Sequence, residues 1–168
     1  MSRLSVLLVV TDTAGGGAEL IVSQLALRGS NDVRYRVVYL RNSVCRTLAP
    51  NEVCINMRSL INPISLIKAA ITIRRYTYTE YSILHAHLVH PLYLCALLPV
   101  RKGTLKVFTE HNTWNRRRNC GIMRLVERFI YSRYHKIACI SPAVQNALIE
   151  WLGPKLRATS RVVENGAR

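Results

Sequence analysis

Mainly apolar runs of four to seven residues recur along the chain, and they are separated by segments with a helical spacing of apolar residues. The runs predict short strands covered on both faces, which are typical of parallel sheets. They lie at residues 5–11, 35–40, 53–57, 82–86, 105–109, 136–140 and 161–164.

Helical spacing is clearest in two of the segments between these runs. The first stripe predicts a helix that ends near Gly29, and the second predicts a helix with an apolar face and a charged face. The first consists of Ala18, Ile21, Val22 and Leu25. The second consists of Ile122, Leu125, Val126, Phe129 and Ile130, with Arg124, Glu127, Arg128 and Arg133 outside it.

Helix starts are marked by short polar residues and proline. Asn62-Pro63 predicts a cap and a first helical position for a helix that runs to about Arg75. Ser141-Pro142 predicts the same for a later helix, and Pro91 is expected to begin another.

The alternation of strand and helix predicts the fold class. We expect one doubly wound, Rossmann-like α/β domain over residues 1–168, a three-layer sandwich with a mainly parallel sheet of six or seven strands. A domain of this class usually closes with a helix over its last strand, so we expect further sequence after Arg168 in the parent protein.

Ligands of such folds bind beyond the carboxyl ends of the strands. Residues 109–118 follow one predicted strand and supply a carboxylate, an imidazole, an amide, an indole and three guanidinium groups. These groups suit a polar, anionic ligand, and the alternative is a solvated loop at a helix entrance. We expect Gly16, His87, His111 and Ser141 to lie along one edge of the sheet.

Glycines 15–17 lie between the first strand and the first helix, where backbone N–H groups can receive a phosphate. A dinucleotide fingerprint would need a glycine at Leu20 and an acidic residue near Leu40-Arg41, so an NAD-binding domain is disfavoured. The alternatives are a simple tight turn and, for Glu19, a favourable position at a helix N-terminus.

His85 and His87 share one face of a predicted strand, and His90 follows. No carboxylate or thiolate accompanies them, so lining a ligand site or packing is favoured over binding a metal, and we expect neither metal nor cofactor. The five cysteines are odd in number and widely spaced, which indicates reduced thiols.

Charge is the abnormal feature of the composition. Twenty-four Lys and Arg against nine Asp and Glu give a net charge of +15, a field that concentrates phosphates on nucleic acid, anionic lipid or a nucleotide. This charge leaves a basic α/β nucleic-acid-binding module as the alternative function. No nucleic-acid-binding signature accompanies the charge, however, so we expect no nucleic-acid partner. The apolar start lacks a cleavage site, which favours a cytoplasmic protein.

Five short motifs, taken together, resemble those of one enzyme family. They are Gly16-Gly17-Ala18-Glu19, His85-Ala86-His87, Thr109-Glu110-His111-Asn112, Glu127-Arg128 before Ile137-Ala138-Cys139-Ile140-Ser141, and Val163-Glu164-Asn165-Gly166. In this order they resemble the N-terminal domain of retaining GT-B glycosyltransferases of the family 4-like group. Trp114-Asn115-Arg116 is most similar to the branch that builds bacterial polysaccharides.

The resemblance implies a transferase that moves a sugar from a nucleotide-sugar donor to a saccharide or polyprenyl-phosphate-linked acceptor in cell-surface polysaccharide synthesis. Its absent C-terminal domain would bind most of the donor, so this half alone is expected to be inactive. Such enzymes need no metal and show no protein nucleophile, so catalysis would rest on positioning and charge stabilisation.

The resemblance also implies roles for single residues. His111 and Glu110 are the catalytic candidates, with His111 contacting the transferring sugar and Glu110 lining the cleft. The substrate-binding candidates are Gly16, Gly17, Glu19, His87, Asn112, Arg116 and Ser141. A further hypothesis is that basic side chains dock the domain to anionic lipid at the inner face of the plasma membrane. These are Arg101, Lys102, Arg116, Arg117, Arg118 and Arg124.

Overall fold

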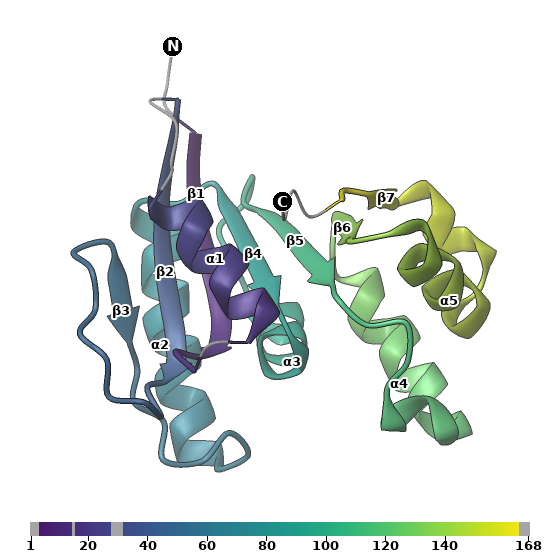
Figure 1. Cartoon of the computed structure of the whole chain (residues 1–168), viewed down its shortest axis with the longest axis horizontal. Helices are drawn as coiled ribbons and strands as arrows, with labels where there is room; N and C mark the ends of the chain where they lie inside the picture. The colour runs from purple at the N-terminus through teal and green to yellow at the C-terminus, as the bar shows by residue number, and fades with distance from the viewer. Residues whose placement is uncertain (1–3, 15, 28–31, 165–168) are drawn as a thin grey trace.

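Seven parallel strands form a single sheet in the order β3-β2-β1-β4-β5-β6-β7 (Figure 1). The structure, a computed structural model, describes residues 4–14, 16–27 and 32–164. The strands are β1 (Leu4–Asp12), β2 (Val33–Arg41), β3 (Glu52–Cys54), β4 (Ile83–His87), β5 (Leu105–Glu110), β6 (Lys136–Cys139) and β7 (Ser160–Val162). The α-helices are α1 (Gly17–Leu27), α2 (Pro63–Thr79), α3 (Val89–Leu97), α4 (Gly121–Ser132) and α5 (Pro142–Leu152), and the 3₁₀ helices are η1 (Arg116–Asn119) and η2 (Pro154–Ala158). The predicted fold class is confirmed.

The two faces of the sheet are covered unequally. On one face Val22 of α1 packs against Leu8 and Val10 of β1. The other face carries the larger core, to which α2, α3, α4 and α5 all contribute buried side chains. Figure 1 shows α1 in front of the strands and α2 and α3 behind them, with α4 and α5 below β6 and β7 in this view. Among the described helices none covers β5, β6 and β7 on the α1 side.

Several predicted element boundaries are close to those observed. The Asn62 side chain accepts hydrogen bonds from the backbone N–H groups of Ile64 and Ser65, as the predicted cap requires, although α2 continues to Thr79. Helix α3 begins at Val89 rather than at Pro91. Pro91 fits there because the first turn of a helix leaves its N–H groups unpaired. The predicted helix end near Gly29 lies outside the described residues.

Helix α4 corrects one prediction. Ile122, Leu125 and Phe129 share a face as predicted, but this face points to solvent, and Ile122 is 73% exposed. Glu127, which we expected on the solvent side, is only 1% exposed. Ile130, the last residue of the predicted stripe, is buried as expected, whereas the other four residues of the stripe are exposed.

Parallel strands bring the loops that follow them to a common edge. Gly16 follows β1, His87 ends β4, His111 follows β5 and Ser141 follows β6, so all four lie at the carboxyl edge of the sheet. No helix in the described part of the chain is long and apolar enough to cross a membrane.

Candidate functional site

Three histidines gather where β4 and β5 end. The Nδ1 atom of His87 lies 3.3 Å from Nε2 of His111, and the His85 and His87 rings stack with their centres 4.3 Å apart. His85 Nε2 also lies 2.7 Å from the hydroxyl oxygen of Thr109. The register pairs His87 with Thr109, which places all four side chains at one point of the carboxyl edge.

The histidines are uncharged at neutral pH. Burial lowers the pKa of His85 to about 4 and holds the pKa of His87 well below its ordinary value. Burial also lowers the pKa of His111, which remains partly exposed. These imidazoles can therefore donate or accept a hydrogen bond at the site without carrying charge.

Glu110 is buried at the carboxyl end of β5. Its carboxylate accepts a hydrogen bond from the Tyr131 hydroxyl of α4 and another, 3.1 Å long, from the backbone N–H of Asn112. The side chain is 4% exposed. This geometry makes Glu110 a support for the loop that carries His111. Glu110 also lines a small pocket with His111 and Asn112, and the cleft-lining role expected for it stays a prediction.

Glu127 is a buried structural support whose contacts the sequence analysis did not predict. Its carboxylate accepts hydrogen bonds from the Tyr93 hydroxyl at 3.1 Å and the Trp151 indole N–H at 2.7 Å. Arg117 of η1 forms an ion pair with it at 2.6 Å. Glu127 thus joins η1, α3, α4 and α5, which fixes the arginine run beside the site.

The arginines of η1 have different environments. Arg117 is held by Glu127, and the Arg118 guanidinium donates to the backbone carbonyl of Thr113. Arg116 is exposed, and it has no ion-pair partner among the described residues. Of the three it is therefore the one available to an anionic ligand.

The loop after β1 is held by Asp12, another residue the sequence analysis missed. Its carboxylate accepts from the backbone N–H groups of Thr13 at 2.7 Å and Ser43 at 2.9 Å, and from Arg41 Nε at 2.7 Å. Burial alone would raise its pKa, but the hydrogen bonds from Ser43 and Arg41 hold the pKa of Asp12 well below its ordinary value. The sequence did offer a signal for Asp12, because this carboxylate ends the first strand just before a glycine cluster.

Glu19 folds back over the glycine loop. A Cβ atom added to Gly16 would lie 2.4 Å from a carboxylate oxygen of Glu19, whereas one added to Gly17 would meet nothing within 4 Å. Burial raises the pKa of Glu19. The N-terminus of α1 therefore lies at the site with its own carboxylate beside it and open space at Gly17.

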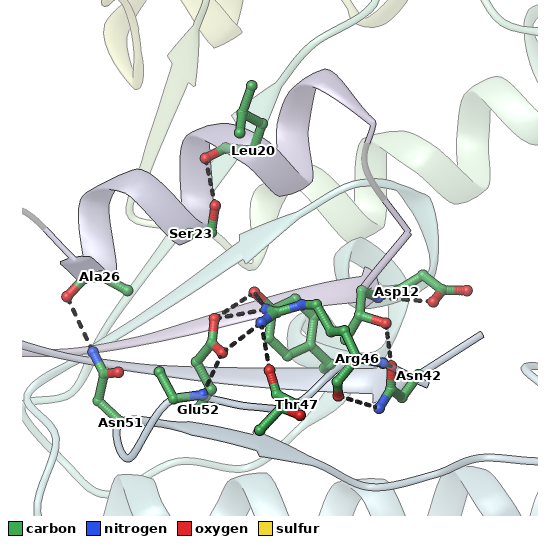
Figure 2. Close-up of polar contacts among 12 residues, drawn as sticks. Asp12, Leu20, Ser23, Ala26, Asn42, Arg46, Thr47, Asn51 and Glu52 are labelled. Atoms are coloured by element: carbon green, nitrogen blue, oxygen red, sulfur yellow. Dashed lines mark hydrogen bonds and ion pairs between the residues drawn. The ribbon is translucent and has the colours of Figure 1, made fainter. Parts of the chain in front are cut away.

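Another buried carboxylate, that of Glu52, organises the neighbouring loop, residues 42–51. Glu52 accepts from Arg46 Nη2 at 2.8 Å, from the Tyr39 hydroxyl at 2.9 Å and from the backbone N–H of Ala49 at 2.9 Å. Figure 2 shows Arg46 reaching Glu52, with Asn42 at the start of this loop and Asp12 beside it. The connection from β2 to β3 thus keeps its shape without a helix.

The remaining predicted residues lie at the same edge. The Ser141 hydroxyl accepts from the backbone N–H of Val144 and caps α5, as predicted, and the Asn112 side chain is exposed. Within the described part of the chain, no group of three or more His, Cys, Asp or Glu side chains is arranged so that it could hold a metal ion. The edge offers neutral imidazoles, a helix N-terminus and a free guanidinium group, which suit phosphate and sugar oxygens.

Sequence comparison places the chain in a family. Residues 15–167, nearly the whole chain, match Glycosyltransferase Family 4. The chain belongs to this family. No curated protein matches it in sequence.

Solved structures share the fold of this glycosyltransferase domain. HepE (Alr3699) of Anabaena, in a complex with UDP and glucose, has a TM-score of 0.74 at 17% identity over 98% of this chain and 45% of its own. Sucrose-phosphate synthase of Thermosynechococcus elongatus has a TM-score of 0.72 at 14% identity, over 99% of this chain and 49% of its own. UDP-GlcNAc 2-epimerase of Methanocaldococcus jannaschii has a TM-score of 0.64 at 11% identity, over 98% of this chain and 46% of its own. The chain thus spans less than half the length of each protein, and the domain is half of a GT-B fold.

Proposed function

We propose that this domain is the acceptor-side half of a retaining, metal-independent glycosyltransferase. The enzyme would transfer a sugar from a nucleotide-sugar donor to a saccharide or polyprenyl-phosphate-linked acceptor in cell-surface polysaccharide synthesis. A C-terminal domain would bind most of the donor, and the present domain alone would be inactive.

One observation carries the proposal: the carboxyl edge combines uncharged hydrogen-bonding groups with positive ones. His111 and His87 present neutral imidazoles, and Arg116 is exposed and unpaired within the described residues. The uncharged groups suit sugar hydroxyls, and the guanidinium suits a leaving phosphate. The complex of HepE with UDP and glucose supports a nucleotide-sugar donor for this fold.

Buried acids make the surface more basic than the net charge suggests. Four of the nine acidic residues are buried, namely Asp12, Glu52, Glu110 and Glu127. Five acids are left to balance the basic side chains outside the core, which favours phosphate-bearing donors and acceptors.

The test is an assay of the protein together with whatever sequence follows Arg168 in its gene. Mass spectrometry against a panel of nucleotide sugars and polyprenyl-linked acceptors should show one sugar added to one acceptor, with the 168-residue chain inactive. An altered nucleotide sugar formed without acceptor would instead indicate an epimerase. Tight RNA or DNA binding at ~0.2 M salt without sugar transfer would support the nucleic-acid alternative.

We also propose that the domain works at the cytoplasmic face of an anionic membrane. Helix α4 exposes Ile122, Leu125 and Phe129, and the α2 segment exposes Ile61, Ile64, Ile67 and Ile71. Both helices lie on the same side of the sheet. Helix α2 contains no acidic residue, and η1 supplies the exposed Arg116 beside α4. Apolar side chains bordered by basic ones are typical of surfaces that dock to anionic lipid.

The basic patch expected from the sequence is divided. Arg101 and Lys102 precede β5, whereas residues 116–118 follow it, so they lie at opposite edges of the sheet. The docking surface is therefore better described by the outer sides of α2 and α4 than by those six residues as a single cluster.

Vesicle co-sedimentation tests this proposal. The domain should bind phosphatidylglycerol vesicles at low salt and release in ~0.5 M salt, because screening shortens the reach of the field. Leu125→Gln and Ile67→Gln should weaken binding, whereas Leu27→Gln should not, since Leu27 is exposed on α1 at the other side of the sheet. Equal binding to neutral vesicles, or equal loss in all three variants, would contradict it.

A further inference from the structure

The hydrogen bond between His87 and His111 contains one proton. The ring that carries this proton determines whether Nδ1 of His111 is a hydrogen-bond donor or an acceptor. The bond joins Nδ1 of His87 to Nε2 of His111 over 3.3 Å. Both rings are neutral, so each carries one proton on one of its two nitrogens. If His87 is the donor, the proton of His111 must be on Nδ1, and if His111 is the donor, its Nδ1 is a bare acceptor.

Burial of His87 distinguishes the two arrangements. The residue is 1% exposed, and its Nε2 has no hydrogen-bond partner among the described residues. If His111 were the donor, neutral His87 would carry its proton on Nε2, as a buried N–H without an acceptor. Orphaned buried N–H groups are rarer than unfilled acceptors. His87 therefore carries its proton on Nδ1 and donates it to Nε2 of His111.

We infer that His87 is a positioning residue that fixes His111 as an Nδ1–H donor to an oxygen of the donor sugar. This inference rests on the proposed function. With Nε2 occupied by His87, Nδ1 is the ring nitrogen of His111 left for a ligand. His111 is partly exposed, and no hydrogen bond to its Nδ1 is present within the described part of the chain.

His85 and Thr109 hold His87 from the other side. The His85 ring stacks on His87 with centres 4.3 Å apart, and its Nε2 is held by the Thr109 hydroxyl at 2.7 Å. These contacts restrict rotation of the His87 ring about its side-chain bonds. The arrangement of Thr109, His85 and His87 thus orients His111 before any substrate arrives.

The tautomers can be measured directly on the 168-residue chain. Long-range ¹H–¹⁵N correlation spectra at pH 7 report which nitrogen of each neutral imidazole carries the proton. We expect Nδ1–H for both His87 and His111. A proton on Nε2 of His111 would overturn the inference, and this result does not depend on enzyme activity.

Two substitutions at His87 test its effect on turnover in the protein extended past Arg168. His87→Asn keeps an N–H near the position of Nδ1, whereas His87→Leu removes the donor. We expect kcat to fall about 10- to 100-fold for His87→Leu and less for His87→Asn, with KM for the nucleotide sugar little changed. Equal losses in the two variants would overturn the inference.

A double variant separates positioning from a structural role. On a His111→Ala background, His87→Leu should cause no further loss of kcat, because its partner is already absent. Independent, multiplicative losses would contradict the inference. If His87→Leu does not fold, His87→Asn and the tautomer spectra still decide. If the extended protein transfers no sugar at all, the proposed function fails while the tautomer result stands.

Discussion

The two sides of the carboxyl edge are held in different ways. On the β1 side, Asp12 binds mostly backbone N–H groups and one nearby arginine. On the β5 side, Glu127 binds side chains from three separate elements. The first arrangement depends on the path of the backbone, and the second depends on the identity of distant side chains. Substitutions should therefore disturb the β5 side when they change the side chains that Glu127 binds, and the β1 side when they change the path of the backbone around Asp12.

The largest expected effect comes from breaking the β5 side. Glu127→Gln should lower the free energy of unfolding by about 3–5 kcal/mol, because Arg117 loses its ion pair and the part-buried indole and phenol donors are left poorly matched. Urea unfolding measures this change. Glu150→Gln, an exposed acid on α5, is the matched control and should change stability by less than about 0.5 kcal/mol. A small loss in Glu127→Gln would show that side-chain donors do not hold this loop.

The second prediction separates catalysis from support on the same side. His111→Ala in the protein extended past Arg168 should lower kcat by about 10²–10³, or about 2.7–4 kcal/mol, with folding largely intact, as for loss of one transition-state donor. Thermal midpoint and turnover are measured on one preparation. Turnover near wild type per folded molecule would assign His111 a structural role only.

The sequence predicted the parallel sheet and the residues at the carboxyl ends of its strands because alternating βα units leave few topologies. Local signals also sufficed for Asn62, whose side chain caps α2 as expected. Glu127 could not be placed, since helical spacing shows which residues share a face and not which face meets the sheet. Its burial depends on Tyr93 and Trp151, which are 34 and 24 residues away in the sequence. Glu110 was placed at the right edge, but its direction depends on Tyr131.

Mild acid should affect the histidine cluster before it affects the β1 side. Burial lowers the pKa values of His85 and His87, so the unfolded chain binds more protons below about pH 6.5. Stability is then full above that pH and falls by about 1.4 kcal/mol per pH unit for each histidine that stays neutral in the fold. The pKa of Asp12 is lowered from a value of 3.8, so its contribution is lost only at more acidic pH.

Chemical unfolding between pH 7 and pH 5 measures this slope. His85→Gln should make the slope shallower, because one buried imidazole is gone. Asp12→Asn should lower stability at every pH in this range and leave the slope unchanged. If Asp12→Asn altered the slope instead, the two sides would not be titrating separately.

The smallest effects should come from two glycines that differ mainly in their position relative to the site. Gly17 and Gly121 are the first residues of α1 and α4, and an added Cβ would meet nothing within 4 Å at either. Alanine at each position should raise stability by about 0.4–1 kcal/mol, because the unfolded chain loses freedom. Only Gly17→Ala should raise KM for the nucleotide sugar, since its methyl group would occupy the open space at the N-terminus of α1 where a phosphate approaches. Thermal midpoints and KM values of the two variants test this, and an unchanged KM in Gly17→Ala would show that the β1 side supports the edge without contacting the donor.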